Sequence, residues 1–356
     1  MHETAELGQS VWLDTISREL ILSGGLKQWM EQGVAGVTTN PSIFEQAIAN
    51  TGDYDGEIAS MARAGRSAAE IYEALTLQEV GAAADILRPV YDRTGGRDGY
   101  VSLEVNPLLA ADRDSTVSEA KRLFAALSRP NVMIKIPATP EGIEAVEACI
   151  AAGVNVNATL IFSEEQYAAV AEAYIRGLEA RALQGVSLEV ASVASVFVSR
   201  VDTAVDKLLK AKGETAILGK IAVDGIRSVY RHFRDLFSGP RWEPLAGKGG
   251  RVQRPLWAST GTKNPAYSDV LYLEALIGPD TVNTVPPKTL SAFLDHGRVR
   301  RTLDSDLDEA GIRAKRLTEL GIDLGAVCSR LLEEGLAAFE SAFHSLMKAI
   351  EEKMKG

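Results

Sequence analysis

The sequence has few cysteines and no long apolar run, and both absences narrow the class of protein. Only two cysteines occur among 356 residues, Cys149 and Cys328, far apart in segments with a helical pattern. We therefore expect no disulfide framework and a reduced, cytoplasmic protein. The first residues contain neither a basic start nor an apolar run, so no signal peptide is expected. No apolar stretch reaches the length that spans a membrane, which predicts a soluble protein with no membrane partner.

Histidine is also scarce, and this limits metal chemistry. The four histidines lie at no metal-ligand spacing and at no predicted strand end, so we interpret them as surface or packing residues. They are His2, His232, His296 and His344. Neither of the glycine-rich loops that bind dinucleotides or nucleotide phosphates is present, so we predict no cofactor. The net charge of −10 argues against a nucleic-acid partner.

Eight short β-rich segments alternate with helical segments along the chain. This alternation predicts an α/β fold, a (β/α)8 TIM barrel formed by one domain that covers residues 1–356. Barrel strands and their connections would occupy about 10–288, and the last helices, about 289–356, would pack on the outside of the barrel. Alternatively, the C-terminal helix covers the barrel mouth or forms a dimer contact. The predicted strands are Ser10–Ile16, Gly36–Pro41, Tyr100–Pro107, Asn131–Thr139, Val154–Phe162, Leu188–Val198, Pro255–Ser259 and Thr281–Val285.

The segments between the strands predict the helices. Residues 42–98 suggest two or three helices, and residues 238–254 read as a flexible loop rich in glycine, proline and basic residues. The glycines of this stretch, GKGG at Gly247–Gly250, are a weak signal for a phosphate loop. The other predicted helices are Ser17–Gln32, Ser115–Leu127, Pro140–Ala152, Glu164–Gln184, Ser199–Lys212 and the chain from Thr289 onward.

The fourth predicted strand, NVMIKIPAT, contains a lysine among apolar residues. Because side chains alternate along a strand, Ile134 and Ile136 share one face and Lys135 points to the other. Burial lowers the pKa of an amine, and a neutral amine is a nucleophile for carbonyl compounds. Alternatively, Lys135 is a structural residue paired with a carboxylate. This stretch alone favours neither interpretation.

The same alternation places polar residues near the carboxyl ends of several strands, where the active sites of such barrels lie. These residues are Asp14, Asn40, Glu104, Lys135, Asn157, Thr159 and Ser259. The set favours Schiff-base chemistry, in which Lys135 attacks a ketose carbonyl and the iminium accepts electrons when the bond between the third and fourth carbons breaks. Glu104 and Asp14 would transfer protons, and Thr159 would hold a water. The alternative is an ion-pair network without activity.

An anion site is predicted at the ends of the sixth and seventh strands. Arg200 begins a helix after the sixth strand, and Ser259 and Lys263 follow the seventh. Phosphate sites in barrels use these late loops together with a helix N-terminus. With Ser195, these residues favour a phosphorylated sugar as the substrate.

Seven motifs in this order and spacing resemble the transaldolase family, in its longer bacterial subfamily, from Trp12 to the C-terminal helix. They are DTISREL, TTNPSIFEQAI, SLEVNP, MIKIPAT, NVNATLIFS, SVFVSRVD and WASTGTKNP. The resemblance implies a class I aldolase-type barrel of the pentose phosphate pathway. Such enzymes transfer a dihydroxyacetone unit from sedoheptulose 7-phosphate to glyceraldehyde 3-phosphate, which yields erythrose 4-phosphate and fructose 6-phosphate.

The resemblance also implies a role for each site residue. Lys135 would form the Schiff base, Glu104 and Thr159 would hold the catalytic water, and Asp14 would act on the C4 hydroxyl. The remaining roles are amide contacts from Asn40 and Asn157 and phosphate contacts from Arg200 and Ser259, with Ser195 nearby.

The sequence departs from the family pattern at two positions. Gly261 stands where many members have a phosphate-binding arginine, and Lys263 is the candidate replacement; Val196 stands where proline is common. The nearest alternative activity is that of a fructose 6-phosphate aldolase, a lyase. Those relatives are shorter and have tyrosine at the position of Phe197, which favours the transferase here. A barrel that binds without catalysis is a second alternative, and the oligomeric state, monomer or homodimer, stays open.

Overall fold

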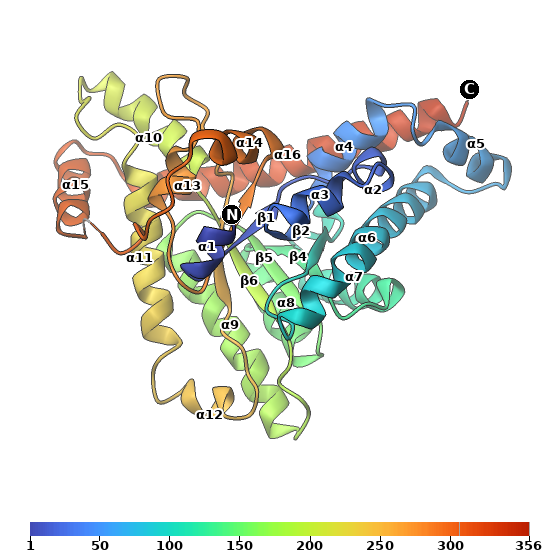
Figure 1. The fold of residues 1–356 in the computed structure, drawn as a ribbon, viewed down its shortest axis with the longest axis horizontal. Helices are drawn as coiled ribbons and strands as arrows, with labels where there is room; N and C mark the ends of the chain where they lie inside the picture. Colours follow the sequence, from blue (N-terminus) through green and yellow to red (C-terminus); the bar gives the residue numbers. More distant parts are fainter. Residues whose placement is uncertain (306, 356) are drawn as a thin grey trace.

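The fold is a closed barrel of eight parallel strands, seen in a computed structural model that describes residues 1–305 and 307–355 (Figure 1). Each strand pairs with the next in the chain, and the last pairs with the first. The predicted TIM-barrel fold is therefore confirmed. The strands are β1 (Gln9–Leu13), β2 (Val34–Thr38), β3 (Val101–Glu104), β4 (Val132–Pro137), β5 (Val156–Ile161), β6 (Ser192–Phe197), β7 (Arg254–Ala258) and β8 (Thr281–Val285).

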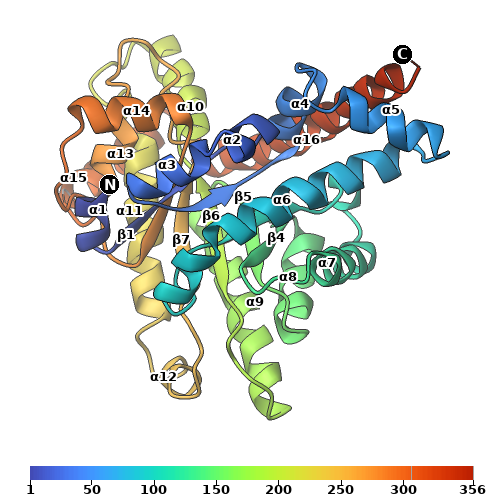
Figure 2. The ribbon, with the colours of Figure 1, turned by 45° about the vertical axis from the view of Figure 1, so that its right-hand side comes forward.

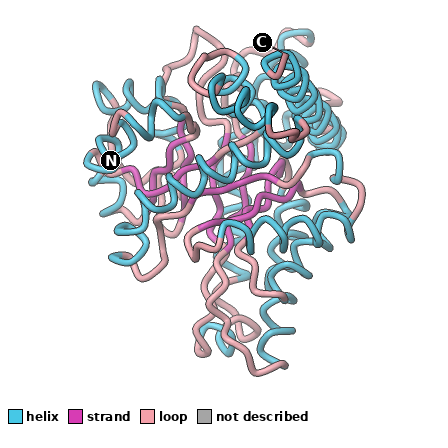
Figure 3. The backbone as a smooth tube through the Cα atoms, turned by 90° about the vertical axis from the view of Figure 1, so that its right-hand side faces the viewer, coloured by secondary structure: helices cyan, strands magenta, loops and turns pink. Residues whose placement is uncertain are grey.

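Helices surround these strands, which lie at the centre of the molecule in Figure 3. Among the described helices, none combines the length and the apolar character needed to cross a bilayer. The helices are α1 (His2–Glu6), α2 (Arg18–Leu22), α3 (Gly25–Glu31), α4 (Pro41–Ala49), α5 (Asp55–Arg63), α6 (Ala68–Arg93), η1 (Pro107–Leu109), α7 (Arg113–Leu127), α8 (Pro140–Ala151), α9 (Glu164–Leu183), α10 (Ser199–Ala211), α11 (Ile221–Leu236), α12 (Glu243–Ala246), α13 (Leu271–Ala275), α14 (Pro287–His296), α15 (Leu307–Glu319) and α16 (Leu324–Lys353).

Several predicted boundaries were wrong for local reasons. The helix predicted over Ser17–Gln32 is two helices, because Gly24 adopts a left-handed conformation with φ of 79° between α2 and α3. The second strand ends at Thr38 rather than at Pro41, since Asn40 caps α4 and Pro41 begins it. The helix α11 was missed, although its buried residues Val223, Ile226, Val229, Tyr230 and Phe233 repeat at helical spacing.

The stretch 238–254 is more ordered than predicted. It contains the short helix α12, and Arg241 forms ion pairs with Glu172 and Glu179 of α9 at 2.6 and 2.7 Å. Arg254 belongs to β7 rather than to the loop. The GKGG motif follows α12, which lies at the opposite end of the barrel from α16 (Figure 1).

A buried ion pair closes the end of the barrel where the strands begin. Arg254 meets the carboxylate of Asp98 at 3.0 Å, and the two side chains are 7% and 9% exposed. Ser10 and the indole N–H of Trp12 donate to the same carboxylate at 2.8 and 3.0 Å. The pair therefore links β1, the segment before β3, and β7.

The long C-terminal helix α16 covers the other end of the barrel. The sequence favoured a place for this helix on the outside of the fold and left open a place over the barrel mouth, and the structure has it across the carboxyl ends of the strands. It contacts α4, α5, α6, α10 and β5, and Figure 2 shows it extending past α4 toward α5. Gly335 of α16 lies so close to β5 that an added Cβ would be 3.0 Å from Leu160.

The replacement Asp98→Ala should destabilise the barrel by about 3–5 kcal/mol, because it leaves the charge of Arg254 buried without its partner. The control is Asp92→Ala, which removes an exposed pair with Arg88 on α6 and should cost about 1 kcal/mol or less. Urea unfolding measures both free energies. Equal losses in the two variants would contradict the structural role of the buried pair.

Candidate active site

Lys135 lies at the carboxyl end of β4 with its side chain in the barrel. Its Nζ donates to the carbonyl oxygen of Thr39 at 2.9 Å and lies 3.3 Å from Oε2 of Glu104. Both charged side chains are 6% exposed. The strand register makes Glu104, Lys135 and Asn157 direct neighbours on β3, β4 and β5. The lysine is thus paired with a carboxylate, and it is also placed where barrel enzymes act.

Two carboxyl groups of this site have raised pKa values. Burial raises the pKa of Glu104, and the positive charge of Lys135 opposes that shift. Burial also raises the pKa of Asp14, against a hydrogen bond from Thr38 and the charges of Lys135 and Lys263. The hydroxyl of Thr38 donates to Asp14 at 2.7 Å. Carboxyl groups whose pKa is shifted upward are suited to give and take protons near neutral pH.

A buried hydrogen-bond chain orients Asn157. The hydroxyl of Ser195 donates to Oδ1 of Asn157 at 2.6 Å, and Nδ2 of Asn157 donates to Ser102 at 3.0 Å. The structure therefore places Ser195 inside the barrel against an amide. Ser102 was not among the predicted site residues, although it shares the strand face of Glu104.

Two buried oxygens of the site have unused hydrogen-bonding capacity. Within the described part of the chain, Oγ1 of Thr159 and Oε2 of Glu104 form no hydrogen bond. The contact of Glu104 with Lys135 at 3.3 Å is an ion pair without hydrogen-bond alignment. Buried polar atoms are seldom left without partners, so both atoms mark a place where a ligand or water can bind.

Strained backbone occurs at the same end of the barrel. Leu160, next to Thr159, has φ of 59°, and Ser259, just after β7, has φ of 56°. The pairing of β5 with β6 shifts register between Ala158 and Ile161. Left-handed conformations are costly for residues other than glycine and tend to gather at functional sites.

Asn40 contributes to the site from the start of α4. Its Oδ1 accepts the N–H of Ile43 at 3.0 Å, so this oxygen caps the helix. The NH₂ group of Asn40 takes no part in this cap.

Of the residues predicted for an anion site, Ser259 contacts Ser199, the chain neighbour of Arg200, whereas Ser195 contacts Asn157. Ser259 exchanges a hydroxyl hydrogen bond with Ser199 at 2.9 Å and accepts the backbone N–H of Ser199 at 3.1 Å. Arg200 lies in the first turn of α10, 5.5 Å from the centroid of the Phe197 ring, and burial lowers its pKa. Ser199 was missed, although its position directly before Arg200 at a helix start was a signal.

Lys263 lies at the edge of this group. It is exposed, yet its charge lowers the pKa of Asp14. Gly261 leaves little room for the larger residue found in many relatives, since an added Cβ would be 3.3 Å from Oγ1 of Thr289. A groove beside α10 also brings Lys207 and Lys210 near Lys263.

Two aspartates of α10 hold the neighbouring segments in place. Asp202 accepts hydrogen bonds from the hydroxyl of Tyr272 and the N–H of Ala222, both at 2.8 Å. Asp206 accepts from the hydroxyl of Tyr267 at 2.5 Å. The segment after β7, which carries Lys263, is therefore fastened to the helix that carries Arg200.

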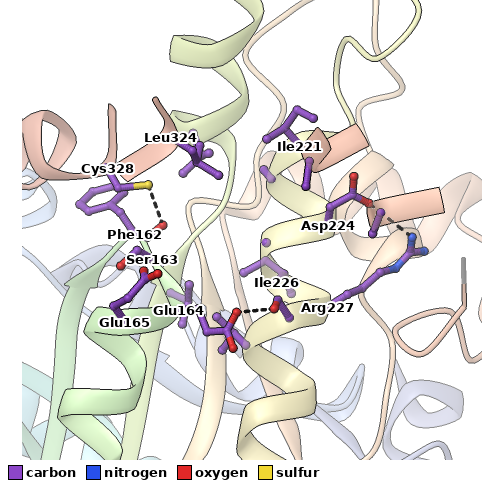
Figure 4. Close-up of a pocket in the computed structure, with 18 of the residues that line it drawn as sticks. Phe162, Ser163, Glu164, Glu165, Ile221, Asp224, Ile226, Arg227, Leu324 and Cys328 are labelled. Carbon is purple, nitrogen blue, oxygen red and sulfur yellow. Dashed lines mark hydrogen bonds and ion pairs between the residues drawn. The ribbon is translucent and has the colours of Figure 1, made fainter. Parts of the chain in front are cut away.

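A separate cavity of about 400 Å³ lies outside the barrel, between α9, α11, α15 and the start of α16 (Figure 4). None of the ten predicted site residues lines it. Two of its polar groups are paired within the protein: Glu164 accepts from Ser228, and the thiol of Cys328 donates to the carbonyl of Phe162 at 3.2 Å. Burial raises the pKa of Cys328 to about 11.

Two of the four histidines contact acidic side chains on the outside of the barrel. His232 contacts Glu164 at 3.2 Å, and His296 contacts Asp269 at 2.9 Å. Residues 1–305 and 307–355 contain no group of three or more histidine, cysteine or acidic side chains arranged to hold a metal ion.

The fold and the site define an enzyme-type (β/α)8 barrel, with a buried lysine beside a carboxylate at the carboxyl ends of its strands. The chain belongs to the transaldolase/fructose-6-phosphate aldolase family, whose model matches residues 11–350. A transaldolase of Trichodesmium erythraeum is 45% identical over 99% of this chain and 97% of that protein. A transaldolase of Thiobacillus denitrificans is 46% identical, and one of Neisseria gonorrhoeae 44%, each over 98% of both chains.

The variant Asp202→Asn should change how stability depends on pH. Burial raises the pKa of Asp202 to about 6 from the ordinary 3.8, so the folded state binds this proton more tightly than the unfolded state. The stability that Asp202 contributes is full below about pH 4 and is lost as the pH rises through about 6. Relative to the wild type, the variant should gain up to about 3 kcal/mol between pH 4 and 7.

Urea unfolding at several pH values measures this gain. Asp235→Asn, an exposed aspartate of α11, is the control and should follow the wild type throughout. A difference between Asp202→Asn and the wild type that stays constant with pH would contradict the interpretation.

Proposed function

We propose that this protein catalyses the transaldolase reaction. A dihydroxyacetone unit would pass from sedoheptulose 7-phosphate to glyceraldehyde 3-phosphate, giving erythrose 4-phosphate and fructose 6-phosphate. The observation that carries the proposal is the buried amine of Lys135, 3.3 Å from Glu104 at the barrel mouth, in a chain of this family. The named relatives, which are about 45% identical over nearly the whole chain, support the same activity.

The first step is the formation of a Schiff base. Glu104 is close enough to take a proton from Lys135, and the neutral amine then adds to the C2 carbonyl of the ketose. Loss of water gives an iminium. The oxygens of Thr159 and Glu104 that lack hydrogen bonds are suited to hold the water involved.

The second step breaks the bond between the third and fourth carbons. Asp14 takes the proton of the C4 hydroxyl, the bonding electrons move into the iminium, and the aldose phosphate leaves. The raised pKa of Asp14 suits a group that holds this proton and later returns it. The three-carbon enamine on Lys135 then attacks the acceptor aldehyde, and the steps run in reverse. Asn157, oriented by Ser195, and Asn40 would bind sugar hydroxyls.

The phosphate group would bind between α10 and the segment after β7. Arg200 and Ser259 would contact it directly, with Ser199 holding Ser259 and the N-terminus of α10 adding its dipole. Lys263 would add a second positive charge where Gly261 supplies none.

The alternative activity is that of a fructose 6-phosphate aldolase. Phe197 argues against it, because a phenyl ring has no hydroxyl to orient a water for release of the three-carbon unit. The ring packs on Phe162, with centroids 5.2 Å apart. The proposed setting is the pentose phosphate pathway in the cytoplasm, with phosphorylated sugars as partners and a monomer or homodimer as the working form.

Treatment with borohydride and fructose 6-phosphate should leave a stable adduct on Lys135, located by peptide mass spectrometry. Lys135→Met should form no adduct and lose at least about 1000-fold in kcat, because no nucleophile remains. Lys121→Met, an exposed lysine of α7, is the matched control and should behave as the wild type. A folded wild-type protein that binds the sugar without forming this adduct would refute the mechanism.

Arg200→Ala should lower kcat/KM for fructose 6-phosphate by roughly 10- to 100-fold and hardly affect unphosphorylated fructose, because a charged hydrogen-bond donor to the phosphate is lost. Lys263→Ala should have a smaller effect of the same kind, and Lys248→Ala, an exposed lysine after α12, should have none. Steady-state kinetics with both sugars measures this. Equal losses for the two sugars would place Arg200 outside the phosphate site.

A further inference from the structure

The ring of Phe339 on α16 lies over the amine of Lys135, and no motif of the sequence pointed to it. The ring centroid is 5.9 Å from Nζ. Phe339 is 4% exposed and Lys135 is 5% exposed. Together with the carbonyl of Thr39 at 2.9 Å and the carboxylate of Glu104 at 3.3 Å, the ring encloses the nitrogen.

Neighbouring residues on the same face of α16 hold this ring in place. Gly335, one turn earlier, permits close approach to β5, because an added Cβ would lie 3.0 Å from Leu160 and 3.6 Å from Arg200. Phe343, one turn later, packs edge-on against Tyr72 of α6, with ring centroids 5.4 Å apart. The helix is thus seated on both sides of Phe339.

We propose that Phe339 is a positioning residue of the active site, which keeps bulk water from the Lys135 nitrogen and from the intermediate bound to it. This inference rests on the proposed function. A phenyl ring offers no hydrogen-bond donor or acceptor, and its face attracts a cation. It therefore accommodates the ammonium of free Lys135 and the iminium of the intermediate without placing a water beside them.

The shielding decides the fate of the three-carbon enamine. In transfer, its third carbon bonds to the aldehyde carbon of the acceptor. In release, that carbon instead takes a proton, water adds to the second carbon of the resulting iminium, and the carbon–nitrogen bond breaks. The products of release are free dihydroxyacetone and the amine of Lys135. Release requires that the third carbon be protonated, and transfer does not. This carbon is only two bonds from the nitrogen that Phe339 shields.

Reductive methylation of the substrate-free protein tests the shielding without any activity. With formaldehyde and cyanoborohydride, Phe339→Ala should raise the labelling rate of Lys135 relative to exposed Lys121 by roughly fivefold or more. Ile350→Ala, which removes a buried side chain about three turns further along the same helix, is the matched control and should label as the wild type. An unchanged rate for Lys135 in Phe339→Ala overturns the proposal.

A second measurement tests the consequence for catalysis. The ratio of dihydroxyacetone release without acceptor to transfer with glyceraldehyde 3-phosphate should rise roughly fivefold in Phe339→Leu and stay unchanged in Ile350→Ala. A folded Phe339→Leu protein with the same ratio as the wild type would show that Phe339 does not decide between release and transfer. If the wild type transfers no unit at all, the proposed function fails, whereas the labelling result still decides whether Phe339 shields the amine.

Discussion

A lysine buried beside a carboxylate inside the barrel is the feature on which the rest of this structure depends. An ammonium out of water needs partners, and three separate parts of the chain provide them around Nζ of Lys135. Thr39 after β2 gives a carbonyl at 2.9 Å, Glu104 of β3 a carboxylate at 3.3 Å, and Phe339 of α16 an aromatic face. Parallel strands in register bring the first two together, because neighbouring strands end at the same rim. The contact with Phe339 requires that α16 cross the barrel mouth.

The two ends of the barrel differ in their polar groups and in their backbone conformation. Where the strands begin, Asp98 and Arg254 are buried as an ion pair, and the carboxylate of Asp98 also accepts hydrogen bonds from Ser10 and Trp12. Where the strands end, Leu160 and Ser259 adopt left-handed conformations, and Thr159 has a buried hydroxyl that lacks a hydrogen bond among the described residues. Strain and unsatisfied polar atoms cost stability, and they persist where the surrounding structure holds them for binding and catalysis.

The helix α10 connects the two halves of the proposed site. Its first turn carries Arg200 toward the proposed phosphate position, while Asp202 and Asp206 fasten the segments that follow α10 and β7. A sugar phosphate held there would extend along the barrel mouth toward Lys135. The same helix contacts α16, so the proposed phosphate site and the cover of the amine share one support. Changes in α10 should therefore affect both substrate binding and the fate of the intermediate.

Local pattern by itself determined the eight strands, their order and most of the proposed site. Alternation of side chains, with polar residues where each strand ends, was enough to pick out Asp14, Glu104, Lys135, Asn157 and Thr159, because the period of a strand and the closure of a barrel leave little choice. Tertiary structure alone decided the contact of Ser199 with Ser259, 60 residues apart, and that of Phe339 with Lys135. These contacts follow from how helices dock on the finished barrel, and docking depends on surfaces that residues far apart in the chain build together.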